Sequence, residues 1–131
     1  MTFDWTHGPL AQGLRDYSAA NFFAAHEAWE TVWLTAPQPE KTFLQGLIQV
    51  TVAFHHLQRS NPLGATRLLT AALRKLEPHS PTFCGIDTAL LCDDIRDRLH
   101  TLDTDPSHQP TPPRIHPQRL TRNPRAPEIV S

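Results

Sequence analysis

Hydrophobic residues recur every three to four positions through most of the first 102 residues, which is the spacing of one face of an α-helix. The clearest case is the segment 21–34, with the sequence Asn-Phe-Phe-Ala-Ala-His-Glu-Ala-Trp-Glu-Thr-Val-Trp-Leu. At about 100° per residue, its large apolar side chains fall within roughly 140° of the helix circumference. They are Phe22, Phe23, Trp29, Trp33 and Leu34. The pattern predicts that this arc faces the core.

Two helices flank that segment in the pattern. Pro9 suits a first helical turn, and the apolar positions after it predict a short helix through Tyr17. Ser18 or Asn21 is expected to cap the next helix by accepting a backbone N–H, and two prolines then end it. The longest predicted helix covers residues 40–59 and is apolar almost all round. Such a helix is typical of the centre of a bundle, where neighbours cover most of its circumference.

Two more helices follow. The dipeptide Asn61-Pro62 predicts a helix start, because Asn caps well and Pro suits the first turn, and the apolar face continues to Leu76. Residues 77–86 hold two prolines and a glycine, and we expect a loop there without strands. Asp87 is then expected to cap a last helix that ends near Leu102.

The end of the chain differs in composition. Seven of the 13 prolines lie in residues 103–131, which contain few apolar side chains. A Pro-rich segment without a core is typically flexible, but four apolar residues could instead fasten it to the bundle as an extended strap. They are Ile115, Leu120, Ile129 and Val130. The sequence therefore predicts an all-α protein, with a compact bundle of about five helices in residues 1–102 and an irregular tail in 103–131.

Charge and cysteine content limit the expected partners and location. Twelve basic and 13 acidic side chains give a formal net charge of −1, so no long-range field favours nucleic acid or an anionic membrane. Cys84 and Cys92 lack the C-x-x-C spacing, and no segment resembles a signal sequence, so we expect a reducing cytoplasm. Every apolar run is shorter than the ~20 residues of a membrane span. No cofactor is expected, and the alternative is a divalent metal such as zinc.

Ionisable side chains and apolar periodicity coincide only in segment 21–34. His26 and Glu30 lie one helical turn apart near the middle of the predicted core-facing arc, so the pattern puts an acid and an imidazole into the core. On the helix 40–59, the polar residues Gln45, Gln49 and His56 fall within roughly 40° of each other. We expect the two sets to meet as a polar cluster between these helices, lined by the aromatic residues Phe22, Trp29 and Trp33.

That cluster has two interpretations. In the first, His26, Glu30 and His56 ligate a divalent metal such as zinc with one position open for water, and Glu27 is the nearby base. The His-Glu-x-x-Glu sequence shares only the first half of the H-E-x-x-H zinc-protease motif, because Glu30 replaces the second histidine. In the second, the same groups form a buried hydrogen-bonded network that fixes helix register and performs no reaction. No motif in these residues dictates a reaction.

Three ordered motifs give the chain a family resemblance. They are Phe22-Phe23-Ala-Ala-His26-Glu27-Ala-Trp29-Glu30-x-x-Trp33, then Leu44-Gln45-Gly46-Leu47-Ile48-Gln49, then His56 followed by Asn61-Pro62-x-Gly64-Ala65. Together they resemble the bacterial family called domain of unknown function 309, over roughly residues 10–102. Ser60 stands where glycine often precedes Asn61 in the family. The resemblance implies a compact helical bundle and matches all six polar positions, but it implies no established activity.

Two functions follow as expectations. The leading one is a non-enzymatic binding or interaction module for an unknown protein or small-molecule partner, with a dry cluster closed off by Trp29 and Trp33. The alternative is a metal-dependent, hydrolase-like enzyme, in which the cluster opens to solvent and His26, Glu30 and His56 surround one ion.

Overall fold

The computed structural model describes residues 1–117. In this part of the chain, the helices are α1 (Gly8–Ser18), α2 (Phe22–Trp33), α3 (Glu40–Gln58), α4 (Pro62–Leu76) and α5 (Thr88–Thr104), with a single 3₁₀ turn at Glu77–His79. The predicted all-α class is confirmed. None of these helices is both long enough and apolar enough to cross a membrane.

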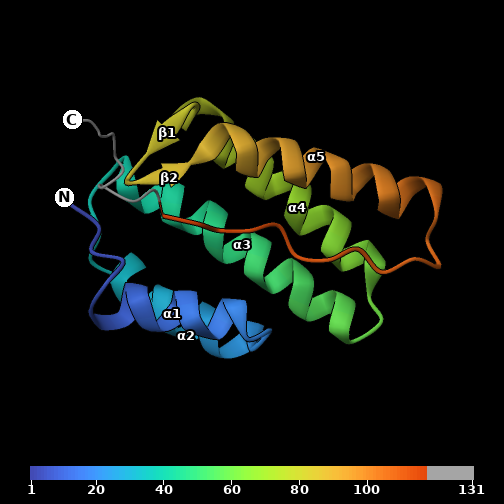
Figure 1. The fold of residues 1–131 in the computed structure, drawn as a ribbon, viewed down its shortest axis with the longest axis horizontal. Helices are drawn as coiled ribbons and strands as arrows, with labels where there is room; N and C mark the ends of the chain where they lie inside the picture. Colours follow the sequence, from blue (N-terminus) through green and yellow to red (C-terminus); the bar gives the residue numbers. More distant parts are fainter. Residues whose placement is uncertain (118–131) are drawn as a thin grey trace, which may run out of the picture.

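Helix α3 runs through the middle of the molecule, with α1 and α2 on one side and α4 and α5 on the other (Figure 1). Most of its circumference is buried, as its nearly uniform apolar sequence predicts. Gly46 permits the close approach of α4, because a Cβ atom there would lie 2.9 Å from the Leu76 side chain. Gly46 therefore lies against α4.

Side chains fix several helix ends. Asn61 accepts a hydrogen bond from the Gly64 N–H, and Asp87 accepts one from the Leu90 N–H, so both predicted caps are confirmed. Asn21 stands before α2, but its side chain makes no capping bond, contrary to the prediction. At the other end of α2, the ammonium group of Lys41 donates to the carbonyl oxygens of Trp33 and Leu34 at 2.9 and 3.3 Å.

A short antiparallel hairpin interrupts the loop before α5, where we had expected no strands. Strands β1 (Thr82–Phe83) and β2 (Ile86–Asp87) pair across the turn residues Cys84 and Gly85. Both turn residues have positive φ angles, 51° and 80°, as in a type I′ turn. Strands of two residues are too short to produce an alternating sequence pattern, which explains why the prediction was wrong.

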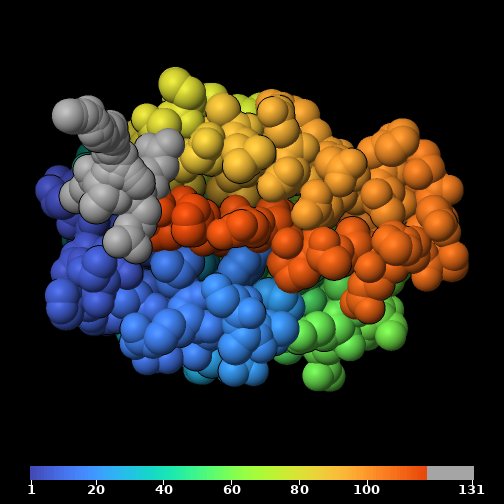
Figure 2. All heavy atoms as spheres, viewed as in Figure 1, coloured from blue at the N-terminus to red at the C-terminus, as the bar shows by residue number. Residues whose placement is uncertain are grey.

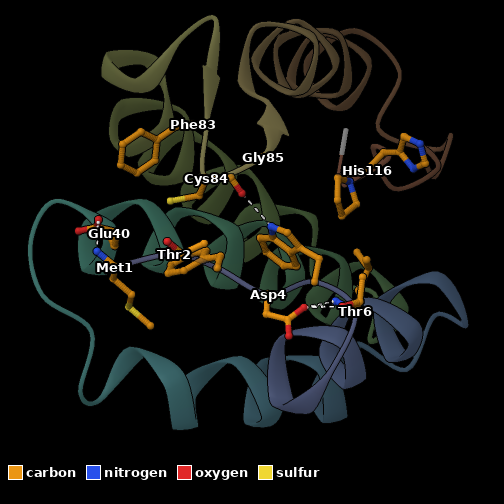
Figure 3. A pocket seen from close by; sticks show the side chains of 13 residues that line it. Met1, Thr2, Asp4, Thr6, Glu40, Phe83, Cys84, Gly85 and His116 are labelled. Atoms are coloured by element: carbon orange, nitrogen blue, oxygen red, sulfur yellow. Dashed lines mark hydrogen bonds and ion pairs between the residues drawn. The ribbon is translucent and has the colours of Figure 1, made fainter. Parts of the chain in front are cut away.

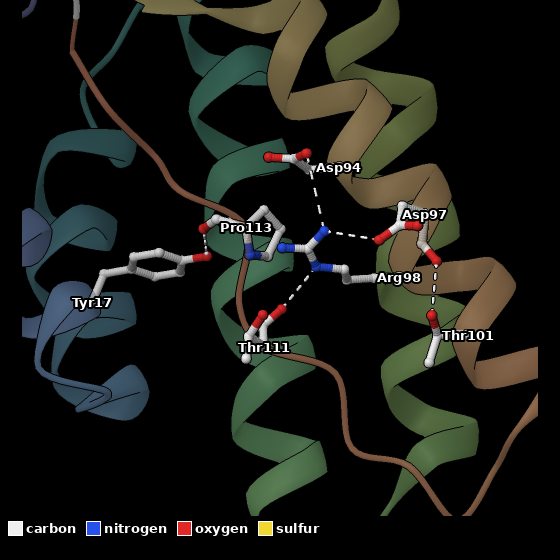
Figure 4. Close-up of polar contacts among 7 residues, drawn as sticks. All are labelled: Tyr17, Asp94, Asp97, Arg98, Thr101, Thr111 and Pro113. Carbon is white, nitrogen blue, oxygen red and sulfur yellow. Dashed lines mark hydrogen bonds and ion pairs between the residues drawn. The ribbon is translucent and has the colours of Figure 1, made fainter.

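Residues 105–117 run back along the bundle in an irregular conformation. Figure 2 shows this segment lying between the α5 side of the molecule and the side formed by α1 and α2. The hydroxyl of Tyr17 donates to the Pro113 carbonyl, and the guanidinium of Arg98 donates to the Thr111 carbonyl at 2.9 Å (Figure 4). Ile115, one of four expected anchors, is buried here.

The other three expected anchors, Leu120, Ile129 and Val130, lie outside the described residues. The division of the chain into a bundle domain and a tail at residue 102 stays a prediction. Within the described residues, the hydrogen bonds from α1 and α5 hold the segment that follows α5 against the helices.

Candidate functional site

Helix α2 buries a different face from the predicted one. Phe22, Ala25 and Trp29 are buried, whereas the side chains of Phe23 and Leu34 are 55% and 64% exposed. The expectation that Phe23 and Leu34 face the core is wrong. Apolar residues occupy two sides of α2, and the packing of α1 and α3 decides which side is buried.

Trp29 is the residue around which α1 and α2 pack. Its indole N–H donates to the Leu10 carbonyl at 3.0 Å, and its ring stacks on Tyr17 with 6.1 Å between centroids. Gly13 leaves room for the ring, because a Cβ there would lie 2.3 Å from the indole nitrogen. These contacts turn Trp29 toward α1, so it does not close off polar residues between α2 and α3. Phe22 packs beside it, against Tyr17 and Phe54.

His26 and Glu30 lie at the rim of the α2–α3 contact. Their side chains are 22% and 50% exposed, and His26 Nε2 is 3.9 Å from Glu30 Oε2. The acid and the imidazole are therefore not in the core, contrary to the expectation. An ion pair so open to solvent contributes little to stability, on the order of 0–1 kcal/mol.

The polar residues of α3 are half-buried and have separate surroundings. Gln45 and Gln49 lie along the partly covered stripe of the helix, and Gln49 Oε1 is buried with no hydrogen-bond partner. His56 Nδ1 is 3.0 Å from the side-chain nitrogen of Asn61, at the corner between α3 and α4. Within residues 1–117, no hydrogen bond links these three side chains to His26 or Glu30.

The antiparallel alignment of α2 and α3 explains why the expected cluster does not form. Gln58 donates to the Ala20 carbonyl at one end of the pair, and Lys41 donates to the Trp33 carbonyl at the other. His56 is therefore level with the start of α2, and Glu30 lies about eight residues, or on the order of 12 Å, farther along it. In the described part of the chain, no three His, Cys, Asp or Glu residues are placed to hold a metal ion together.

The solvent-facing side of α2 carries a second pattern. Phe23, Glu27, Glu30 and Leu34 are all exposed and follow one another at four-, three- and four-residue steps. These steps place them within about 60° of the helix circumference. We call this set of four residues the α2 face. It contains two of the predicted polar residues, Glu27 and Glu30, between two apolar residues that had been assigned to the core.

Two neighbours border the α2 face. The Phe23 ring lies between two imidazoles, with centroid distances of 5.3 Å to His26 and 5.6 Å to His55 of α3. The Trp33 ring is covered by Lys41, whose ammonium nitrogen is 4.2 Å from the ring centroid. The indole N–H of Trp33 is buried and, like Gln49 Oε1, has no hydrogen-bond partner among the described residues.

The charged side chains of the α2 face are both acidic. Helix α2 contains no Lys or Arg, and neither Glu27 nor Glu30 forms an ion pair with a Lys or Arg of residues 1–117. The cluster expected from the sequence made Glu30 a metal ligand or a member of a buried network and Glu27 the nearby base, so this exposed pattern was not predicted. The spacing of Phe23 and Leu34 around the two carboxylates is the sequence feature that could have revealed it.

Comparison with known proteins places the α2 face in a shared segment. Residues 10–68 match the model of the family described as "Domain of unknown function (DUF309)". "Uncharacterized protein YpuF" of Bacillus subtilis (strain 168) is 34% identical over 62 residues, 47% of this chain and 36% of that relative. The chain thus spans about a third of the relative's length. The match covers all of α2 and α3, and it is the resemblance that the three sequence motifs predict.

Proposed function

We propose that the protein is a non-enzymatic interaction module that binds a basic, amphipathic segment of a partner protein along the α2 face. The observation that carries the proposal is the exposure of Phe23 and Leu34 on either side of two carboxylates, neither of which forms an ion pair with a Lys or Arg of residues 1–117. Large apolar side chains that remain exposed on a rigid helix are typical of docking surfaces, where they serve as anchors.

The dimensions of the α2 face suit an elongated partner. Phe23 and Leu34 are eleven residues apart, so their Cα atoms are separated by about 16 Å along the helix. A partner helix or extended peptide with two apolar side chains at that separation would contact both anchors at once. Burying one such side chain completely contributes about 1.5–3 kcal/mol, and because these are already partly covered, each would contribute less. A transient complex of modest affinity follows from these magnitudes.

The charge of the α2 face selects among such partners. Glu27 and Glu30 lie between the anchors, and α2 offers no Lys or Arg that would neutralise them. Lys or Arg side chains of a partner would be attracted to this position, whereas acidic side chains would be repelled. Because exposed charges are screened by salt, association with a basic segment should weaken as ionic strength rises.

Site-specific photo-crosslinking in cells tests the proposal and does not require the partner to be identified beforehand. A photoreactive amino acid is placed at position 23 or at position 34, and at position 63 as the control. Leu63 is a suitable control because it is 60% exposed on α4 and is not part of the α2 face. We expect the same partner to be captured at 23 and 34, through a segment of net positive charge, and not at 63.

A charge variant sharpens the experiment. Replacing Glu27 and Glu30 by Gln should reduce the crosslinking yield at position 23 severalfold. Replacing Asp93 and Asp103 by Asn removes the same amount of charge and should leave the yield unchanged. Both control aspartates are exposed on α5. Equal capture at position 63, or capture through an acidic segment, would contradict the proposal.

The alternative, a metal-dependent hydrolase-like enzyme, has less support from the geometry. His26 and Glu30 are close enough to share an ion, but a third ligand would have to come from beyond their immediate surroundings, since His56 bonds Asn61 at the α3–α4 corner. We retain the cytoplasm as the proposed location because Cys84 and Cys92 are both free thiols. The near-neutral composition leads us to propose neither nucleic acid nor a membrane as the partner.

A further inference from the structure

A pocket of about 890 Å³ lies at the end of the molecule where the first six residues, the β1–β2 turn and the end of segment 105–117 meet (Figure 3). This volume falls in the range of small-molecule sites, about 300–1,000 Å³. Most of its lining comes from residues outside the family-matched segment 10–68. None of its lining residues belongs to the α2 face, so the pocket supports a separate inference.

Aromatic rings form the apolar wall of the pocket. Phe3, Trp5 and Phe83 line it, and Phe3 meets Trp5 edge to face with 5.8 Å between centroids. Trp5 is held in place because its indole N–H donates to the Cys84 carbonyl at 2.8 Å. The faces of Trp and Phe rings attract cations through their quadrupole, most strongly where water is partly excluded.

Two carboxylates, Asp4 and Glu40, also line the pocket. The Thr6 hydroxyl and backbone N–H both donate to Asp4, and they hold the pKa of this carboxyl below its usual value. A hydrogen bond from its own backbone N–H lowers the pKa of Glu40, helped by the Met1 ammonium group. Both side chains are therefore negatively charged at neutral pH.

Few groups that can carry a positive charge lie at the pocket. No Lys or Arg is among the described residues that line it, and the imidazole of His116 lies at the opposite end of the pocket from Glu40 in Figure 3. The ammonium nitrogen of Met1 lies 3.3 Å from Glu40 Oε2. Aromatic faces and carboxylates together are the groups that recognise organic cations in proteins.

We infer that this pocket binds a small organic cation, with an ammonium group carried on an aromatic or aliphatic body. The cationic group would lie near Asp4 and Glu40, and the apolar body would lie against Trp5 and Phe83. The inference adds a small-molecule site to the chain and is independent of the partner proposed for the α2 face.

Phenethylammonium is a suitable probe, with phenethyl alcohol as its neutral counterpart of similar shape. Each is titrated into the full chain while the three tryptophan indole resonances are followed by NMR, with the Trp5 resonance identified through Trp5→Phe. We expect the ammonium probe to shift the Trp5 resonance and to leave that of the fully buried Trp29 in place, and we expect the alcohol to bind more weakly.

Charge variants separate recognition of the cation from simple apolar binding. Asp4→Asn combined with Glu40→Gln should raise the dissociation constant of phenethylammonium by about fivefold or more, without changing that of the alcohol. Asp93→Asn with Asp103→Asn changes the net charge equally at exposed positions of α5, outside the pocket, and should have no effect. An unchanged Trp29 resonance verifies that each variant is folded.

Three results would overturn the inference. They are a Trp5 resonance that does not move, equal affinity for the ammonium and the alcohol, and equal weakening by the two pairs of charge substitutions.

Discussion

Phe22 and Phe23 are neighbours in the chain, yet Phe22 is 3% exposed between Tyr17 and Phe54, whereas Phe23 is 55% exposed between two imidazoles. We expect Phe22→Ala to lower the free energy of unfolding by about 3–5 kcal/mol, because it leaves a cavity. Phe23→Ala should cost less than about 1 kcal/mol. Urea unfolding of both variants checks this, and similar losses would mean that α2 buries the face the sequence predicted.

Gly13 and Trp29 give a second prediction. A Cβ at position 13 would lie 2.3 Å from the indole nitrogen, and the ring cannot move away because it is fully buried and bonded to the Leu10 carbonyl. Gly13→Ala should therefore destabilise the protein by about 1–3 kcal/mol, although alanine favours helix. Gly46→Ala is the matched comparison, since its Cβ would lie 2.9 Å from Cγ and Cδ2 of Leu76, which is a milder clash than the one at position 13. Thermal unfolding should show the larger loss at position 13.

The hydrogen bond from Tyr17 to the Pro113 carbonyl fastens segment 105–117 to α1. Removing it with Tyr17→Phe should cost about 0.5–1.5 kcal/mol in the free energy of unfolding. The amide protons of residues 111–117 should also exchange faster with solvent in the variant, which hydrogen-exchange mass spectrometry measures. Unchanged exchange in this segment would mean that other contacts hold it.

Tyr17 also predicts how stability depends on alkaline pH. Burial raises the pKa of this hydroxyl above its ordinary value of about 10. The folded state therefore holds the Tyr17 proton more tightly than the unfolded state does. The contribution of this hydroxyl to the free energy of unfolding is complete below about pH 10 and is lost as the pH rises toward the folded-state pKa. The free energy of unfolding should fall by up to about 1.4 kcal/mol per pH unit in this range.

The chain offers a direct readout, because Tyr17 is its only tyrosine. Near-ultraviolet absorbance of tyrosinate should not appear in the folded protein at pH 10 and should appear on unfolding. Tyr17→Phe should remove the part of the alkaline slope that this residue causes, while the part due to the cysteines and lysines remains. An ordinary titration midpoint in the folded protein would contradict the burial.

Metal content distinguishes the two functions expected from the sequence. For an interaction module, protein purified without an affinity tag should contain the same trace of zinc, manganese and iron as His26→Ala prepared in parallel. The variant should also be nearly as stable as the wild type, because the polar contacts of His26, with Glu30 and the Phe23 carbonyl, are open to solvent. Near-stoichiometric metal that disappears in His26→Ala would instead support the hydrolase-like alternative.

Cys84 provides a chemical test of the hairpin. Burial raises the pKa of this thiol to about 11, so its reactive thiolate is scarce at neutral pH. Alkylation by iodoacetamide in a Cys92→Ser background should be slow at neutral pH and should accelerate up to about pH 11. An alkylation midpoint near that of an ordinary thiol would mean that the turn opens readily.

The sequence by itself determined the features that depend on neighbouring residues. The helix spanning 40–58, the caps at Asn61 and Asp87 and the all-α class follow from periodicity and from hydrogen bonds that span only a few residues. The family motifs likewise lie within a continuous stretch, residues 10–68. These features do not depend on how the helices pack.

Only the tertiary structure decided which residues become a site. Apolar side chains cover more than half of the α2 circumference, so the pattern could not determine whether Phe23 would be buried, and the contact of Trp29 with α1 settled it. The sequence pattern gives the angle of each side chain around its helix but not its position along the axis of the neighbouring helix. The antiparallel pairing of α2 and α3 sets that position, and it places His56 about two turns away from Glu30 along the helix axis. The pocket beside Trp5 joins residues more than a hundred positions apart, and such contacts arise only when the whole chain has folded.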